Sequence, residues 1–145
     1  MPKFTVTEIH TTQDQELAFE LRTRVFVKEQ GVNPDHEIDE IDKHCIHVIT
    51  RCEKMIVGTG RLIWKEKSIC HIGRMAVDRG WRKFGVGTLM LQKLEKIALE
   101  NNYTEIHLHA QTHAEEFYIK NGFIPTGEVF LDENITHILM VKNLN

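Results

Sequence analysis

The stretch that decides the fold is Met75-Ala76-Val77-Asp78-Arg79-Gly80-Trp81-Arg82-Lys83-Phe84-Gly85-Val86-Gly87-Thr88-Leu89-Met90. Its pattern predicts an apolar strand, a short basic turn, a loop with two glycines and the first turns of an amphipathic helix. Gly85 and Gly87 have no side chain that would keep a ligand away from the backbone. The N–H groups and partial positive charge at a helix N-terminus attract anions. The stretch therefore predicts a phosphate or pyrophosphate site, with added charge from Arg79, Arg82 and Lys83.

Two common phosphate-binding loops do not match this stretch. In a P-loop a lysine follows the last glycine, whereas Lys83 precedes Gly85. The dinucleotide fingerprint needs a third glycine, but Gly87 is followed by Thr88-Leu89-Met90. The remaining pattern is Arg-x-x-Gly-x-Gly between a strand and a helix.

Composition limits the classes of protein that fit. The 145 residues suit one domain over 1–145, and 41% hydrophobic and 27% charged residues are typical of a soluble globular protein. The net charge of -3 argues against nucleic-acid and membrane partners. Three cysteines without metal-type spacing predict free thiols in a reducing compartment. With no signal-peptide pattern at the N-terminus, we expect a cytoplasmic protein.

The order of the expected elements indicates the fold class. Helices are expected from Thr12 to Gln30, over 86–101 and over 112–121, with capping boxes at Thr12 and Thr112. Strands are expected over 4–9, 45–50, 55–64, 69–77, 106–110, 123–130 and 135–141. This order predicts an α+β fold, in which helices flank a mixed, mostly antiparallel central sheet.

Three segments carry a resemblance to a known family. The run Arg82-Lys83-Phe84-Gly85-Val86-Gly87 resembles the acetyl-coenzyme A signature of the GNAT superfamily of N-acetyltransferases. The segment 111–123, with Phe117-Tyr118 and Gly122-Phe123, resembles the part of that family after its fifth strand. The segment 21–32, together with Glu37-Ile38-Asp39, is similar to the small bacterial ElaA-like subgroup.

The resemblance implies a cosubstrate and the residues that bind it. Acetyl-coenzyme A would place its pyrophosphate on backbone N–H groups of residues 82–88 and pair its pantetheine arm with the strand at Met75 and Val77. The implied cofactor-binding residues are Met75, Ala76, Val77, Arg82, Lys83, Phe84, Gly85, Val86, Gly87, Thr88 and Phe117.

The resemblance also implies catalytic residues. Tyr118 matches a tyrosine that protonates the departing thiolate, and its alternative role is a packing aromatic. His71 lies where the family often has a glutamate base, and a histidine suits that task because its ordinary pKa is near neutrality. The alternative for His71 is a structural role, as a partly buried histidine that is hydrogen-bonded to the backbone. In that case water would relay the proton and no enzyme base would be needed. A Cys70–His71 pair is disfavoured, because neighbours on a strand point to opposite faces.

Further polar residues are expected to form the acceptor pocket. The family's fifth strand borders the acyl site, which implies substrate contacts by His109 and Gln111, with His137 nearby. Of Arg22 and Arg24, one is expected to pair with the acidic segment 35–42 and the other to bind substrate; Arg22 is the substrate candidate. That acidic segment would attract a cationic amine. His107, His109 and His113 lack a completing carboxylate or cysteine, so no metal is expected.

These patterns predict an acetyl-coenzyme A-dependent N-acetyltransferase that acts on a primary amine of a small molecule by direct attack. A protein lysine or N-terminus is the alternative acceptor. A coenzyme A-binding sensor without catalysis and a nucleotide-binding protein outside this family are the alternative functions. The sequence leaves open whether the protein is a monomer or a homodimer.

Overall fold

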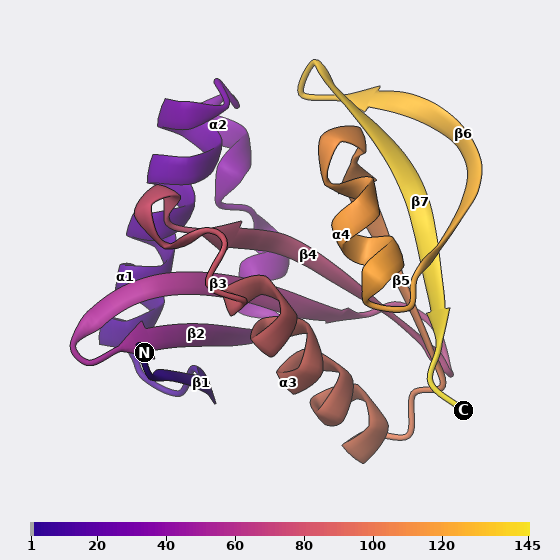
Figure 1. Cartoon of the computed structure of the whole chain (residues 1–145), viewed down its shortest axis with the longest axis horizontal. Coiled ribbons are helices and arrows are strands. Elements are labelled where there is room, and N and C mark those ends of the chain that lie inside the picture. Colours follow the sequence, from indigo (N-terminus) through magenta and orange to yellow (C-terminus); the bar gives the residue numbers. More distant parts are fainter. Residues whose placement is uncertain (1) are drawn as a thin grey trace.

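The computed structural model describes residues 2–145 and contains a seven-stranded sheet in the order β1-β2-β3-β4-β5-β7-β6 (Figure 1). Within it, β4 and β5 pair in parallel, and the other neighbouring strands of the described chain pair antiparallel. The predicted α+β fold with a mixed, mostly antiparallel sheet is confirmed. The strands are β1 (Phe4–Glu8), β2 (Ile46–Cys52), β3 (Met55–Trp64), β4 (Ile69–Val77), β5 (Glu105–Gln111), β6 (Ile124–Asp132) and β7 (Ile135–Asn143).

Helical segments connect the strands. A long N-terminal helix begins as α1 (Thr12–Arg22) and continues as the π-helix η1 (Thr23–Glu29). None of the helices within residues 2–145 is both long enough and apolar enough to cross a lipid bilayer. The remaining helical segments are α2 (Pro34–Glu37), η2 (Glu40–Lys43), η3 (Arg79–Trp81), α3 (Val86–Glu100), η4 (Thr112–Ala114) and α4 (Glu115–Lys120).

The two long helices pack on opposite faces of the sheet. On one face, Val86 and Met90 of α3 lie so close to β3 that a Cβ at Gly58 would be 2.9 Å from each of their side chains. On the other face, Leu21 of α1 packs against Ala76 of β4. We call these the α3 face and the α1 face.

The alternation of β5 divides its side chains between these faces. Ile106, Leu108 and Ala110 are buried in the core with α3 and with Phe123, which follows α4. The intervening His107, His109 and Gln111 therefore lie on the α1 face. His71 pairs with His107 and His137 pairs with Gln111, so these two histidines share that face.

The observed helix ends differ in part from the ends that the sequence predicts. The N-cap of α1 is Thr11, whose side chain accepts a hydrogen bond from the Asp14 amide, one residue before the predicted Thr12. The predicted capping box at Thr112 is wrong, because its hydroxyl lies 2.5 Å from the Thr136 hydroxyl instead. Pro34 begins a new short helix, since proline suits a first helical position. The predicted end of α4 at Asn121 and Gly122 is confirmed.

Candidate active site

The candidate site is a cleft where two parallel strands part. β4 and β5 pair only over Ile69–Ile72 and Glu105–Leu108. Beyond this point the last residues of both strands line a cleft of about 1450 Å³. Its walls carry residues of both faces, including Tyr118 from α4 and His71 and His109 from the α1 face. The gap in the sheet therefore connects the two faces.

A β-bulge shapes the β4 side of this gap. Thr59 pairs with Ala76 and Arg61 pairs with Gly73, so two β4 residues oppose the single residue Gly60. The extra residue is accommodated at Arg74, which has a positive φ of 49°. Met75, Ala76 and Val77 follow the bulge and line the cleft, as predicted for residues that pair with a pantetheine arm. Since β5 offers them no partner, this strand edge is available to a ligand.

The predicted glycine loop lies at one end of the cleft. The first backbone hydrogen bond of α3 runs from the Leu89 amide to the Gly85 carbonyl, at 3.1 Å. The amides of Val86, Gly87 and Thr88 precede it and so have no intrahelical partner. All three residues line the cleft, together with Gly85, Lys83 and Arg82. The loop therefore offers the helix N-terminus that the sequence predicts as an anion cradle.

The two loop glycines are needed for different reasons. Gly85 has a φ of +81°, which glycine adopts without strain, and a Cβ there would meet nothing within 4 Å. At Gly87, a Cβ would lie 2.7 Å from Cζ of Phe117. The absence of a side chain at Gly87 thus lets α3 approach α4, the helix that carries Tyr118.

Two predicted cofactor residues have other contacts. Arg82 donates to Glu29 through Nη1 at 2.6 Å and Nη2 at 2.9 Å, and its Nε donates to the Val77 carbonyl at 3.0 Å. The Phe84 ring lies outside the cleft and packs against Trp81, with centroids 5.8 Å apart. Phe84 can therefore contribute its backbone to a ligand but not its side chain.

Tyr118 is a half-buried residue in the cleft wall. Its ring lies edge-on to Phe117 and Phe123, with centroid distances of 5.0 and 5.9 Å. Burial raises the pKa of the Tyr118 phenol to about 12. The phenol is therefore protonated at neutral pH, which is the state that a proton donor needs.

The α1-face wall is rich in imidazoles. The His71 ring lies 5.1 Å from that of His109 and 5.7 Å from that of His107, centroid to centroid. Burial, followed by the neighbouring His109, lowers the pKa of His71 to about 4. Burial and His137 also lower the pKa of His109. Both rings are therefore neutral at pH 7, so each has one nitrogen that can accept a proton.

The predicted acceptor residues come together except for one. His109, Gln111 and His137 line the cleft. Phe130, which no sequence pattern linked to the site, is outside the cleft lining and packs behind it, edge-on to His109 at 5.0 Å and stacked on His137 at 5.8 Å. It escaped notice because it belongs to the distant strand β6 and no local pattern links it to β5.

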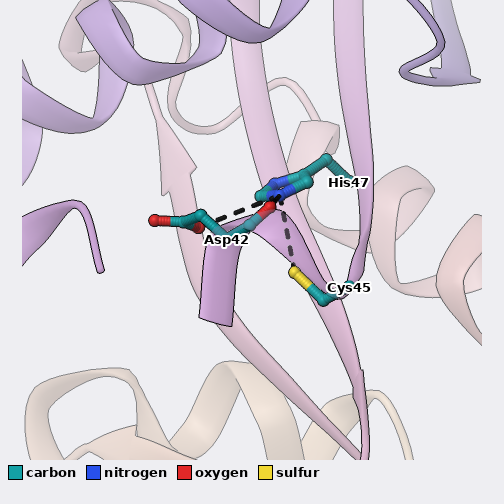
Figure 2. A group of neighbouring side chains, drawn as sticks. All are labelled: Asp42, Cys45 and His47. Atoms are coloured by element: carbon teal, nitrogen blue, oxygen red, sulfur yellow. Dashed lines mark hydrogen bonds and ion pairs between the residues drawn. The ribbon is translucent and has the colours of Figure 1, made fainter. Parts of the chain in front are cut away.

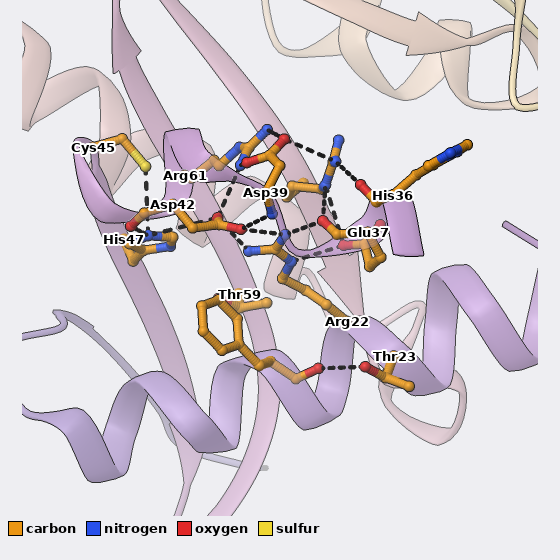
Figure 3. A network of polar contacts seen from close by, with 12 residues as sticks. Arg22, Thr23, His36, Glu37, Asp39, Asp42, Cys45, His47, Thr59 and Arg61 are labelled. Carbon is orange, nitrogen blue, oxygen red and sulfur yellow. Dashed lines mark hydrogen bonds and ion pairs between the residues drawn. The ribbon is translucent and has the colours of Figure 1, made fainter. Parts of the chain in front are cut away.

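Arg22 is the exception, and its predicted substrate role is not supported. Its side chain is 1% exposed and donates to Glu37 at 2.8 Å and to Asp42 at 2.7 Å (Figure 3). Arg24 pairs with Asp78 instead, at 3.2 Å. Both arginines are therefore paired, and neither lines the cleft. A buried guanidinium needs such partners, because an unpaired buried charge is costly.

Arg22 belongs to an ion network (Figure 3), whose members Glu37, Arg61 and Arg74 also line the cleft. Arg61 of β3 donates to Asp39 and Asp42, both at 2.8 Å, and Arg74 of the bulge lies 3.1 Å from Glu37. The expected attraction of a cationic amine by this acidic segment is therefore weakened, since arginines neutralise its carboxylates. The sequence signal for the buried ion pair between Arg61 and Asp42 is that Arg61 is a lone charged residue within an apolar strand.

A cluster of Asp42, Cys45 and His47 lies at the edge of the network (Figure 2). His47 Nε2 is 2.9 Å from the Asp42 carbonyl and 3.4 Å from Cys45 Sγ. Burial raises the pKa of the Cys45 thiol to about 11, so the sulfur is not a thiolate at neutral pH. The guanidiniums of Arg22 and Arg61 on the Asp42 carboxylate disfavour a cation here.

Comparisons with known proteins agree with this architecture. A family model described as an acetyltransferase (GNAT) domain matches residues 8–144. The uncharacterized N-acetyltransferase YjcF of Bacillus subtilis (strain 168) is 37% identical over 128 residues, which cover 87% of this chain and 90% of that protein. Protein ElaA of Escherichia coli (strain K12) is 30% identical over 129 residues, which cover 86% of this chain and 84% of that protein.

Solved structures show the same fold. The crystal structure of Escherichia coli ElaA matches with a TM-score of 0.86 at 26% identity, covering 97% of this chain and 99% of that one. An aminoglycoside 6'-N-acetyltransferase complexed with coenzyme A matches with a TM-score of 0.81 at 19% identity, covering 97% of each chain. The predicted resemblance to the GNAT family is confirmed, and ElaA is among the relatives that the chain matches. The chain belongs to the GNAT family of acetyltransferases.

Proposed function

We propose that the protein transfers an acetyl group from acetyl-coenzyme A to a primary amine of a small molecule, by direct attack of the amine on the thioester. The observation that carries this proposal is the cleft itself. It joins an anion cradle at Gly85–Thr88, an unpaired strand edge at Met75–Val77 and the protonated phenol of Tyr118 in one continuous space. Family membership supports acetyl transfer in general, and these residues support the finer assignment.

The cofactor end fits the ligand by its chemistry. The free amides of Val86, Gly87 and Thr88 suit a pyrophosphate, and the exposed Arg79 and Lys83 add positive charge beside them. Acetyl-coenzyme A would supply an acyl thioester, whose arm the backbone at Met75 and Val77 is free to pair with. No metal is part of this proposal.

Tyr118 and His71 are proposed to handle the protons. As the C–N bond forms and the C–S bond breaks, the Tyr118 phenol gives its proton to the sulfur. The lowered pKa of His71, about 4, keeps the imidazole neutral but makes it a weaker base than an ordinary histidine. In this proposal it accepts the proton that the amine loses, directly or through water. Direct attack needs no enzyme nucleophile. Cys70 suits none, since its buried thiol has a pKa raised to about 11.

A narrow acceptor end favours a small amine over a protein segment. His36 Nδ1 of α2 lies 2.6 Å from the Glu133 carboxylate in the turn between β6 and β7. Both residues line the cleft, so this contact spans its mouth. A folded protein surface would have to displace it.

The experiment is calorimetry with acetyl-coenzyme A, followed by an amine screen that detects thiol release. Wild type should bind, and Gly85→Glu with Gly87→Glu should abolish binding by filling the cradle with charge and bulk. Tyr118→Phe should lower turnover about 100-fold with little change in cofactor affinity. No binding by wild type would refute the cofactor assignment. Binding without turnover on any amine would favour the sensor, and turnover on lysine peptides alone would favour a protein acceptor.

A further inference from the structure

Two adjacent side chains at the end of η1 reach both sides of the cleft. Glu29 contacts Arg82, which precedes the glycine loop on the β4 side. Gln30 forms a reciprocal amide pair with Gln111 at the end of β5, with N···O distances of 3.1 and 2.8 Å. Each partner is more than 50 residues away in sequence, so these contacts depend on the tertiary fold.

Each of the three side-chain nitrogens of Arg82 donates one hydrogen bond within the protein. Its two terminal nitrogens form a bidentate pair with Glu29, the strong geometry for an arginine and a carboxylate. Its Nε donates a hydrogen bond to the carbonyl of Val77, the last residue of β4. The arginine thus ties the start of the loop to the strand behind it and to η1. A phosphate that bound Arg82 in this bidentate geometry would have to displace Glu29.

The loop that follows has strained backbone that needs such support. Lys83 has a φ of 76°. This left-handed backbone conformation is energetically unfavourable for any residue that carries a side chain. Gly85 is left-handed as well. In contrast to Arg82, Arg79 and Lys83 have no ion pair within residues 2–145, so their charge remains available to an anion.

We infer that Arg82 is a positioning residue, which Glu29 locks in place so that the loop amides point into the cleft, and that it is not itself a ligand of the coenzyme A phosphates. The bidentate contact also lowers the pKa of Glu29, which keeps the carboxylate charged. This inference deepens the proposed function and rests on it. Under this inference an acidic residue, Glu29, strengthens the binding of an anion.

The sign of one effect tests the inference. We would measure the coenzyme A Kd by calorimetry for wild type and Glu29→Gln. If Glu29 positions Arg82, Glu29→Gln should weaken binding about 3- to 10-fold, because the loop loses its anchor. If Arg82 is a phosphate ligand that Glu29 restrains, the same variant should bind more tightly, which would overturn the inference.

A charge swap separates positioning from direct contact. Arg82→Glu alone should lose binding, and the double variant Glu29→Arg with Arg82→Glu should recover most of it, because the ion pair is restored in reverse. Failure of this swap to recover binding, in a variant whose melting temperature matches wild type, would overturn the inference. Asp14→Asn is the matched control, since its pair with Arg51 is similarly exposed and lies away from the cleft. It should leave the Kd unchanged.

The dependence of the coenzyme A Kd on ionic strength distinguishes a direct charge contact from a purely structural role. Lys83→Gln should flatten the salt dependence of the coenzyme A Kd, since a charge near the phosphates is lost. The double variant Glu29→Gln with Arg82→Gln removes the pair without changing the net charge. It should weaken binding and leave that slope unchanged, and a flattened slope would overturn the inference. No coenzyme A binding by wild type would refute the proposed function itself, which is a different outcome from tight binding by Glu29→Gln.

Discussion

Arg74, the left-handed residue of the β4 bulge, is held by Glu37, with Arg74 Nε 3.1 Å from the carboxylate Oε2. The same carboxylate oxygen accepts from Arg22 at the end of α1, at 2.8 Å. The bulge that opens the strand edge for a ligand is thus braced by a charged network from the N-terminal helix. Of the three arginines in this network, Arg61 and Arg74 line the cleft together with Glu37, whereas Arg22 lies behind them.

Asp42 should make the stability of the protein depend on pH. Burial opposes its ionisation, but hydrogen bonds from Arg22 and the Asp39 amide outweigh burial and lower its pKa from 3.8 to about 2. A lowered pKa means that the ionised form stabilises the fold above pH 4, and that this contribution is lost as the pH falls toward 2. Asp42→Asn should cost about 3 kcal/mol at pH 7, because the buried arginines lose a partner.

The measurement for Asp42 is urea unfolding at several pH values between 7 and 2. The free energy of unfolding of wild type should fall more steeply below pH 4 than that of Asp42→Asn. Equal slopes for the two proteins would show that Asp42 is not responsible. Asp35→Asn is the control, since Asp35 is exposed and outside the network.

Gly87→Ala should disturb the contact between α3 and α4. The new methyl group would lie 2.7 Å from Phe117 Cζ, so the ring or the helix must move. We expect a loss of about 1–2 kcal/mol in the free energy of unfolding, together with weaker acetyl-coenzyme A binding. Gly80→Ala is the matched control, because a Cβ there would meet nothing within 4 Å. Chemical denaturation and calorimetry measure both effects, and a Gly87→Ala protein indistinguishable from Gly80→Ala would contradict the expectation.

His71→Gln should lower turnover about 100-fold if the imidazole is the base, with little effect on cofactor affinity. The pKa of His71 is lowered to about 4, so the neutral, active form persists well below pH 6. Wild-type kcat/KM should then show no loss assignable to His71 until the pH approaches 4. His107→Gln serves as control, because its ring is bonded to Glu105 on the same wall. Similar losses in both variants would mean that His71 acts through packing alone.

Much of the fold could be predicted because its signals are local. The bounds of β3 and β4 agree with the prediction to the residue, since both are apolar runs with polar turns at their ends. The glycine loop was predicted from strand, turn and helix patterns that lie next to one another. Family resemblance then supplied what spacing alone does not encode, such as the placement of Tyr118 in the cleft.

The misassigned features depend on contacts between distant residues. An arginine within an apolar stretch is visible in the sequence, but whether Arg22 meets Glu37 or a substrate depends on the path of the acidic segment. The π-helix at Thr23–Glu29 was expected as ordinary helix, because its hydrogen-bond pattern leaves little trace in apolar periodicity. The N-cap was displaced by one residue because Thr11 and Thr12 offer the same hydroxyl.

The separation of β4 and β5 also affects how substrates would enter the cleft and how products would leave it. The opening lies between the two faces of the sheet. The glycine loop begins α3 on one face, and the imidazole-rich wall belongs to the α1 face. A bulky nucleotide carrier and a small amine would then arrive from different sides and meet in the middle. Under the proposed function, coenzyme A and the acylated amine would then leave from different sides, so the release of one product would not require prior release of the other.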